Sequence, residues 1–383
     1  MKERRRRKIL VVIGTLAHMG GAERQAVHLV EYLHGKTECD VELLAFEDGL
    51  VIRTAMERLG VKVHVHPYYF RWPKKRRIAS LVRLAARIRF QLMPDAILPF
   101  VGIHSKAIAQ IGPYTGAKFY WWNQQDEGRD LFGTAEEKKI LHRLSCITSN
   151  STIGRDFLAA TYDINPSRIR VYNNGTPLPG EVSRCYVFRE RIGVGNRPMI
   201  TMLANVTPFK DHATLLKAFQ IVLKETAANP VLLLAGHLRD DAHLQSLKTL
   251  AFDLGLSSES VRFLGPVSEV DLLLRGSDVV AHSSLLEGCP NAVCEAMAYG
   301  LPVVATDIPG CRQALGDDAG CNLVSPSTPM AFAGSLIRML NDEGLRTAAG
   351  RANRERIKSD FSIEGMNDFF RQQIEDGLGC SLN

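Results

Sequence analysis

The stretch DVVAHSSLLEGCPNAVCEAMAYG, residues 278–300, joins an apolar run to a helical pattern through a turn. Its first residues, DVVAHS, are typical of a short buried strand. Pro290 suits the first turn of a helix and Gly300 suits the position after its end, so a helix is expected over 290–299. The stretch therefore predicts a strand, a tight turn and a helix that begins beyond the carboxyl end of the strand.

The same alternation of apolar runs and amphipathic patterns extends along the whole chain. Short, nearly continuous apolar runs between helices indicate parallel strands that are buried in doubly wound sheets. The expected strands are 8–14, 41–46, 62–67, 95–100, 118–123, 146–151, 170–175, 199–205, 231–236, 261–265, 278–283, 302–307 and 322–324. The predicted fold class is therefore α/β, with two Rossmann-like domains of doubly wound parallel sheet.

The boundary between these domains is expected in the turn-rich stretch NNGTPLPGE at 173–181, because the strand pattern restarts near residue 198. A length of 383 residues also suggests two domains, at roughly 100–200 residues each. We predict one domain over 1–180, a second over 181–362, and a C-terminal helix over 363–383 that packs back on the first domain. Since ligands bind beyond the carboxyl ends of such strands, we expect the site in a cleft between the domains.

The composition, 45% hydrophobic and 23% charged, is that of an ordinary soluble globular protein. No apolar run approaches the roughly 18–20 residues that span a bilayer. The N-terminus MKERRRRKILVVIG has too short an apolar part for a signal peptide, so we interpret it as a basic tail before a first strand. The eight cysteines are scattered without a C-x-x-C pair, which favours free thiols in the cytoplasm.

The net charge of +6 is unevenly distributed. Residues 1–180 hold 28 Lys and Arg against 17 Asp and Glu, a balance of +11, and the remainder holds 19 against 24, a balance of −5. Two basic blocks stand out, at 2–8 and at 71–89, and the second interleaves arginines with apolar residues in a helical pattern. We expect a basic amphipathic helix that contacts an anionic membrane surface through Arg76, Arg77, Arg83 and Arg87.

The alternative for this block is a solvated face on one helix of a folded domain. Nucleic acid is not expected as a partner, because the basic residues are not interleaved with stacking aromatic side chains and no nucleic-acid-binding motif accompanies them.

Two further segments follow expected strands and open helices. GTLAHMGGAER, at 14–24, lacks the G-x-G-x-x-G dinucleotide fingerprint, but Gly20 and Gly21 would let backbone N–H groups approach a phosphate or a sugar. A plain tight turn is the alternative. ANVTPFKDH, at 204–212, places Lys210 at the start of a helix, where a lysine can hold a diphosphate. An exposed surface lysine is the alternative there.

The turn EGCPNAVCE, at 287–295, carries two carboxylates around the start of its helix. Backbone N–H groups at the beginning of a helix lack intrahelical partners and form a site for an anion or a hydroxyl. Glu287 could reach a ligand held there, and Glu295 could accept hydrogen bonds from vicinal hydroxyls such as a ribose diol. The alternative is that Glu295 is solvent-exposed and Glu287 is an acid near the helix cap.

Several motifs are missing from the chain. There is no D-x-D, which argues against a carboxylate-bridged Mg²⁺ or Mn²⁺ on a sugar diphosphate, and we expect no metal site. There is also no G-x-x-x-x-G-K-[ST] and no G-x-S-x-G, so an ATPase and a serine hydrolase are disfavoured.

Taken together, four features resemble the retaining glycosyltransferases of the GT-B fold, family four. They are E-x7-E within EGCPNAVCEAMAYGLPVVATD (287–307), Gly-Gly-Ala-Glu-Arg (20–24), NNG (173–175), and a lysine after the first strand of the second domain. The resemblance implies retaining transfer of a sugar from a nucleotide sugar without a metal or other cofactor. A UDP-sugar is favoured and a GDP-sugar is the second choice. The first domain would then bind the acceptor and the second the nucleotide sugar.

The resemblance also implies roles for single residues. Glu287 and Lys210 would be catalytic, with Lys210 stabilising the leaving diphosphate. Glu295 would bind the ribose. The remaining donor-binding residues would be Gly288, Cys289, Pro290, Asn291, Asn205, Gly20 and Gly21, and the acceptor-binding residues would be Asn123, Gln124, Glu23 and Arg24.

Some positions depart from the family pattern. Asn205 stands where many members have an arginine, so Lys210 or another cation such as Arg312 would carry the phosphate charge. Asn123 or Gln124 stands where many have a histidine. The expected acceptor is a saccharide or a lipid-linked saccharide in polysaccharide, lipopolysaccharide or glycoconjugate assembly, at the inner face of the cytoplasmic membrane. The alternatives are a sugar-nucleotide epimerase or phosphorylase of similar fold, a non-catalytic nucleotide-sugar-binding protein, and a glycosidase that uses Glu287 and Glu295.

Overall fold

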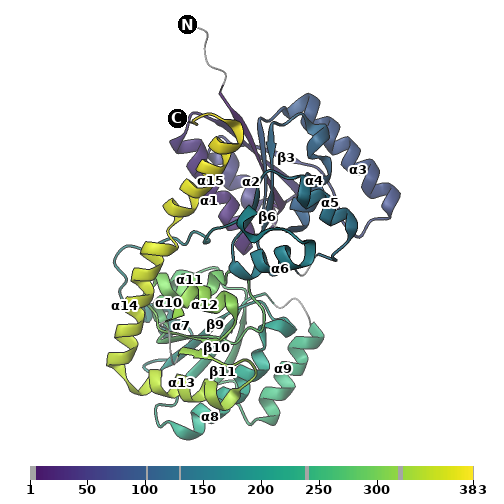
Figure 1. Ribbon diagram of the computed structural model, residues 1–383. Helices are drawn as coiled ribbons and strands as arrows, with labels where there is room; N and C mark the ends of the chain where they lie inside the picture. The colour runs from purple at the N-terminus through teal and green to yellow at the C-terminus, as the bar shows by residue number, and fades with distance from the viewer. Residues whose placement is uncertain (1–5, 101, 129–130, 238–240, 318–321, 383) are drawn as a thin grey trace. The chain divides into compact units, whose positions relative to one another are not determined.

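The computed structural model describes residues 6–100, 102–128, 131–237, 241–317 and 322–382. The chain divides into two compact units, unit 1 (Met1–Gly175 and Ile363–Asn383) and unit 2 (Thr176–Ser362). The change of unit at Gly175 falls before the boundary at 180 that the sequence suggested. Part of the basic block at 2–8 and Cys321 lie outside the described residues. Helices and strands alternate along the chain in each unit (Figure 1).

Unit 1 contains two parallel sheets. The five-stranded sheet has the order β3-β2-β1-β4-β5, and the three-stranded sheet has the order β6-β7-β8. The strands are β1 (Lys8–Thr15), β2 (Asp40–Glu47), β3 (Lys62–Val65), β4 (Ala96–Pro99), β5 (Phe119–Tyr120), β6 (Trp122–Gln124), β7 (Ile147–Ser149) and β8 (Ile169–Val171). The helices are α1 (Gly21–Lys36), α2 (Val51–Arg58), α3 (Lys74–Arg87), the π-helical η1 (Ile88–Leu92), α4 (Gly102–Thr115), α5 (Ala135–Arg143), α6 (Thr152–Tyr162), the 3-10 turn η2 (Pro166–Arg168) and α15 (Ile363–Leu378).

The prediction of a single strand over 118–123 is wrong, because the chain leaves one sheet and enters the other within this run. β5 pairs with β4, whereas β6 pairs with β7. Trp121 lies between the two strands with no exposed surface, and its ring stacks on Phe370 at 5.7 Å. The run KFYWWN contains no glycine or proline that would have marked the break.

The C-terminal helix α15 is part of the core of unit 1. Phe370 is fully buried, and its ring lies 5.3 Å from Phe100 and 4.8 Å from Tyr172. α15 also contacts α1, where the Tyr32 hydroxyl donates to Asp368 Oδ1 at 2.9 Å. The last helix therefore completes the fold of the segment that begins the chain.

Unit 2 is built on one six-stranded parallel sheet with the order β11-β10-β9-β12-β13-β14. Its strands are β9 (Met199–Leu203), β10 (Val231–Ala235), β11 (Val261–Gly265), β12 (Val279–His282), β13 (Val303–Thr306) and β14 (Leu323–Val324). Its helices are α7 (Tyr186–Arg191), the 3-10 turn η3 (Pro208–Lys210), α8 (His212–Glu225), α9 (Asp241–Asp253), α10 (Val270–Gly276), α11 (Asn291–Ala298), α12 (Pro309–Leu315), α13 (Pro329–Asn341) and α14 (Glu343–Asp360).

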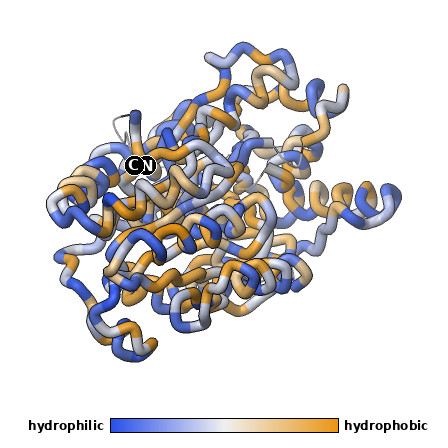
Figure 2. The backbone as a smooth tube through the Cα atoms, turned by 90° about the horizontal axis from the view of Figure 1, so that it is seen from below, coloured by the Kyte–Doolittle hydropathy of each residue, from blue (hydrophilic) through white to orange (hydrophobic). Residues whose placement is uncertain are grey.

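Helices cover both faces of this sheet, which explains why most of its strand residues are apolar instead of alternating with polar ones. Successive strand residues point to opposite faces. Ile200 and Val279 pack into a core with α8 and α13, whereas Val280 and Val303 pack into a core with α11 and α12. Hydrophilic positions (blue) and hydrophobic positions (orange) alternate along the helices in Figure 2.

The two ends of unit 2 are held together. Thr176 and Ser362 form an isolated parallel bridge, and the Thr176 N–H donates to Phe361 O at 2.8 Å. In unit 1, the Gln25 side chain makes two hydrogen bonds with the backbone of Gly175. Gln25 Nε2 donates to the Gly175 carbonyl at 3.0 Å, and Gln25 Oε1 accepts from the Gly175 N–H at 2.9 Å. None of the described helices is long and apolar enough to cross a lipid bilayer.

Candidate functional site

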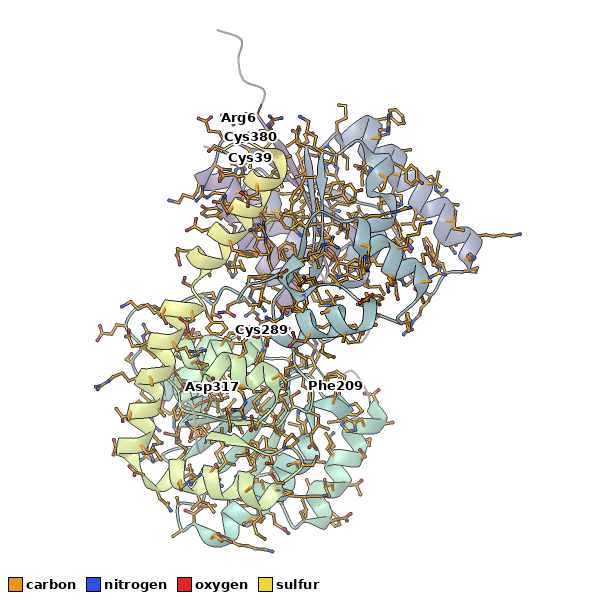
Figure 3. All side chains as sticks on the ribbon, viewed as in Figure 1. Arg6, Cys39, Phe209, Cys289, Asp317 and Cys380 are labelled. Atoms are coloured by element: carbon orange, nitrogen blue, oxygen red, sulfur yellow. The ribbon has the colours of Figure 1, made fainter. Side chains whose placement is uncertain are left out.

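The loops after the strands of unit 2 gather at the carboxyl edge of its parallel sheet. β9 and β12 are neighbours in this sheet, so η3, which follows β9, lies beside the loop that follows β12. Phe209 in η3 and Cys289 in the β12 loop are labelled in Figure 3. The order of the strands thus brings Lys210 and Glu287 together, although they are far apart in the sequence.

Lys210 and Glu287 are in direct contact. Lys210 Nζ donates to Glu287 Oε1, and His282 Nε2 lies 2.8 Å from the same oxygen. Glu287 is 9% exposed and His282 is 2% exposed. Burial by itself would raise the pKa of Glu287, but the charge of Lys210 and the hydrogen bond from His282 together hold this pKa well below its usual range. Glu287 is therefore a buried, ionised carboxylate with two donors on one oxygen.

The loop after β12 is fastened to η3 by hydrogen bonds. Ser283 Oγ donates to Lys210 O at 3.1 Å, and Ser284 Oγ donates to Phe209 O at 3.2 Å. The Leu285 N–H also donates to Phe209 O, at 2.8 Å. These bonds hold the backbone on both sides of the contact between Lys210 and Glu287.

α12 packs closely on the same loop. A Cβ atom built on Gly310 would lie only 2.5 Å from Glu287 O and would also overlap Gly288 O. A glycine is needed here because the first turn of α12 touches the loop backbone directly.

The helix expected over 290–299 is α11. Pro290 is its N-cap with φ −76° and ψ 91°, one position before the first helical residue, and its carbonyl accepts from the N–H groups of Val293 and Cys294. Gly300, with φ +69°, follows the helix as expected. Gly288, Cys289 and Pro290 are buried, Asn291 is half-buried, and Glu295 is half-buried in the second turn of α11.

Two buried histidines were missed by the sequence reasoning. His282 ends β12, and His212 begins α8 and is 1% exposed. Neither ring nitrogen of His212 has a hydrogen-bond partner among the described residues. Burial, together with His243, His282 and Lys210, lowers the pKa of His212 to about 4, so its ring is neutral near pH 7. The available signal was a titratable residue at the end of an apolar run, in DVVAHS.

Asn205 and Arg312 have partners within unit 2. Asn205 Oδ1 accepts from the His237 N–H at 3.1 Å. Arg312 Nη2 donates to both carboxylate oxygens of Asp307 at 2.5 Å. Arg312 is therefore already paired with an acid, and Lys210 is the cation that this structure places beside Glu287.

In unit 1, Gly20, Gly21, Glu23 and Arg24 lie at the start of α1. Gly20 is the N-cap, and a Cβ there would lie 2.5 Å from Glu23 Oε2. Gly21 is exposed, Arg24 is half-buried and Glu23 is 9% exposed. Glu23 lines a pocket of about 640 Å³, together with Gly14, Thr15, Phe46, Glu47, Tyr68, Tyr69, Phe70, Arg71, Trp72 and His104.

Asn123 and Gln124 lie in β6, and neither lines this pocket. Both are buried. Asn123 Oδ1 accepts from Thr148 Oγ1 and from the Tyr172 hydroxyl, each at 3.0 Å, and Gln124 Oε1 accepts from Trp122 Nε1 at 3.0 Å. The two side chains therefore contribute to the interior of the small sheet. Asn123 Nδ2 has no partner among the described residues.

The four arginines of α3 differ in their surroundings. Arg76 and Arg83 are exposed, and the Arg76 guanidinium lies 3.9 Å from the centre of the Trp72 ring. Arg77 and Arg87 are half-buried, and Arg87 donates to Val65 O at 2.6 Å. Among the described residues, no group of three or more His, Cys, Asp or Glu side chains could hold a metal ion.

Two family models match most of the chain. Residues 19–178 match Glycosyltransferase Family 4, and residues 188–356 match Glycosyl transferases group 1. A D-inositol 3-phosphate glycosyltransferase of Salinispora arenicola is 28% identical over 259 residues, which cover 62% of this chain and 57% of that protein. The chain thus spans little more than half the length of this curated relative.

Solved structures share the fold over most of the chain. HepE of Anabaena in complex with UDP-glucose superposes with a TM-score of 0.82 and 18% identity, covering 96% of this chain and 99% of that one. WaaG, a glycosyltransferase involved in lipopolysaccharide biosynthesis, superposes with a TM-score of 0.71 and 14% identity, covering 94% and 98%. With two parallel-sheet units of this topology, and a family model matching within each, the chain belongs to the GT-B glycosyltransferases of family four.

Proposed function

We propose that this chain is a metal-independent, retaining hexosyltransferase that uses a nucleotide sugar, with a UDP-sugar as the favoured donor. The observation that carries the proposal is the buried cluster of Lys210, Glu287 and His282 at the carboxyl edge of the unit 2 sheet. An ionised carboxylate beside a lysine and a helix N-terminus suits a ligand that is both a polyol and a diphosphate.

In the proposed reaction, the bond between the anomeric carbon and the diphosphate oxygen breaks, and the acceptor oxygen bonds to the same face of that carbon. The acceptor proton passes to the departing diphosphate. Lys210 and the first N–H groups of α11 stabilise the charge that develops on the diphosphate. Both contacts of the Glu287 carboxylate within the described part of the chain are made to Oε1, so Oε2 can accept from a donor-sugar hydroxyl.

The remaining donor contacts follow the order of the loop and helix. Gly288, Cys289, Pro290 and Asn291 would form the turn around the sugar, and Glu295 would hold the ribose from the second turn of α11. Asn205 would complete the part of the donor site that unit 2 provides. A UDP-linked donor is favoured because the similar structure of HepE contains UDP-glucose.

For the acceptor, we propose the pocket of unit 1 that Glu23 lines. Aromatic rings together with carboxylates can stack on a saccharide and accept from its hydroxyls, and five aromatic side chains line this pocket. Arg24 lies in the same helical turn as Glu23. Asn123 and Gln124 are buried in β6 outside this pocket, so they would not contact an acceptor bound there. The acceptor is a saccharide or lipid-linked saccharide at the inner face of the cytoplasmic membrane. The exposed Arg76 and Arg83 would contact this membrane surface.

The test is to screen UDP- and GDP-sugars for thermal stabilisation of the protein and for hydrolysis or transfer. We expect a UDP-sugar to raise the melting temperature and to be consumed, with the α-configuration kept in the product. Stabilisation without turnover in the presence of acceptor extracts would instead indicate a non-catalytic binding protein. A new sugar nucleotide formed from donor alone would indicate an epimerase.

A further inference from the structure

A groove of about 690 Å³ lies on unit 1 between α3, α4 and α5. This volume is in the range of sites that bind small molecules, which is roughly 300–1,000 Å³. Four large apolar side chains of the groove are more than half exposed: Ile78 (52%), Val82 (63%), Phe90 (71%) and Tyr114 (67%). Exposed apolar residues on a protein surface are usually scattered singly. Four of them along one groove therefore indicate an interaction site.

The exposed apolar face of α3 is separate from the face that holds the helix in the fold. Leu84 is fully buried in the core against the unit 1 sheet, together with Ile88 of the following π-helical turn. Ile78 and Val82, one helical turn apart, line the groove instead. Packing of α3 therefore does not account for its second apolar face.

The charges around the groove are mainly positive. Arg89, Lys139 and Arg143 line it, together with one carboxylate, Glu136, among the lining residues. Glu136 Oε1 already accepts from Gln110 Nε2 at 3.2 Å. An apolar floor with an excess of cations at its edge complements an amphiphile that has a hydrocarbon chain and an anionic headgroup.

We propose that this groove binds an acyl chain of an anionic phospholipid, so that unit 1 is anchored in one leaflet of a membrane rather than held at its surface by charge alone. Ile78, Val82 and Tyr114 contact the chain, and Arg89, Lys139 and Arg143 face the phosphate. The exposed Arg83 and the ring of Trp72 at the start of α3 suit the headgroup layer. The inference rests on the membrane contact in the proposed function, but not on the sugar chemistry.

Vesicle flotation separates the groove from simple charge attraction. The probes are phosphatidylglycerol and phosphatidylcholine vesicles, and the groove variant is Ile78→Gln with Val82→Gln. Both positions are more than half exposed, so the variant should fold, and its melting temperature checks this. We expect wild type to float with phosphatidylglycerol vesicles, still in part at high salt, and the groove variant to partition about tenfold more weakly. Leu50→Gln, at an apolar residue of unit 1 that is 76% exposed and outside the groove, should float like wild type.

Quenching by phospholipids with brominated acyl chains tests insertion directly. Tyr114→Trp places an indole in the groove, and Phe252→Trp places one at an exposed position of unit 2 as a control. Trp121 and Trp122 are fully buried, and the partly exposed Trp72 is present in wild type and in both variants, so the quenching of wild type is the reference for all three. We expect brominated phosphatidylglycerol vesicles to quench the Y114W protein more strongly than wild type and the F252W protein.

Each contrary result overturns the proposal. Equal flotation of wild type and the groove variant, lost at high salt, would mean attachment by charge alone. Absence of extra quenching at position 114 would mean that no acyl chain enters the groove. Binding of a protein partner in the groove, without binding of vesicles, would lead to the same conclusion. Donor hydrolysis in solution, measured on the same variants, is expected to be unchanged and reports separately on the glycosyltransferase proposal.

Discussion

At the scale of single residues, the contact between Lys210 and Glu287 adds a structural role to the catalytic role proposed for Lys210. The sequence suggested only that Lys210 faces a diphosphate, but the structure shows that its charge also compensates a buried carboxylate. Lys210→Met should therefore destabilise unit 2 by about 3–5 kcal/mol as well as abolish transfer, because it leaves an uncompensated buried charge. Urea unfolding and a transfer assay measure the two effects.

The matched control is the double variant Lys210→Met with Glu287→Gln, which removes both charges. We expect it to recover most of the lost stability while staying inactive, since the N–H groups of α11 would be left without the lysine charge to stabilise the diphosphate. Recovery of both stability and activity would exclude a catalytic role for Lys210.

His282 donates to the same carboxylate oxygen from the end of β12. His282→Leu should cost about 1–3 kcal/mol of unfolding free energy, because Glu287 loses a donor in a buried place. His282→Gln retains an N–H group and should cost less. If calorimetry also shows that His282→Leu binds UDP more weakly than His282→Gln does, His282 positions Glu287 for the donor. Equal affinities of the two variants would mean that His282 contributes to stability only.

Sequence reasoning could find Glu287 and Lys210 because a motif spacing and a loop after a strand mark them. It could not predict their contact, which depends on β9 and β12 being neighbours in the sheet. His282 was hidden in an apolar run, and the pairing of Arg312 with Asp307 depends on side-chain conformation rather than on residue type.

At the scale of elements, the packing of α12 on the β12 loop depends on Gly310. Gly310→Ala should destabilise unit 2 by about 1–3 kcal/mol and weaken donor binding, because the added Cβ would push the loop away from α12. Gly334→Ala is the control, since Gly334 lies in α13 with no atom near its would-be Cβ, and it should stabilise the helix by about 0.5–1 kcal/mol. Circular dichroism melts measure the stability of each variant, and calorimetry with UDP measures its donor affinity. A donor affinity that Gly310→Ala leaves unchanged would contradict this account of the loop.

Most elements were predictable because each buried strand of a parallel sheet is a continuous apolar run between helical patterns. The division of 118–123 into β5 and β6 was not, because both halves are equally apolar and only their pairing partners differ. The exposed apolar face of α3 could be seen in its helical pattern, but the groove required α4 and α5 to be placed beside it.

At the scale of the whole molecule, each unit contains a histidine with a lowered pKa, the half-buried His104 in unit 1 and the buried His212 in unit 2. Burial lowers the pKa of His104 in unit 1 to about 4, and burial with neighbouring cations and histidines lowers that of His212 in unit 2 to about 4. Between pH 6.5 and about 4 the unfolded chain binds more protons than the folded one, so stability falls as the pH is lowered through this window.

Between pH 7 and pH 5, we expect the unfolding free energy of unit 1 and that of unit 2 each to fall by about 2 kcal/mol in total, as measured by urea unfolding. His212→Phe should flatten this dependence in unit 2 while leaving that of unit 1 unchanged. An unaltered pH dependence of unit 2 in that variant would show that other groups cause the loss.

The bridge between Thr176 and Ser362 makes unit 2 an insertion within unit 1, with its entry and its exit side by side. A gene fragment encoding residues 176–362 would therefore encode a module with adjacent ends, whereas deleting the final helix α15 would remove part of the unit 1 core. Unit 2 could then be exchanged between related genes by a single cassette with two junctions, leaving unit 1 of the recipient intact.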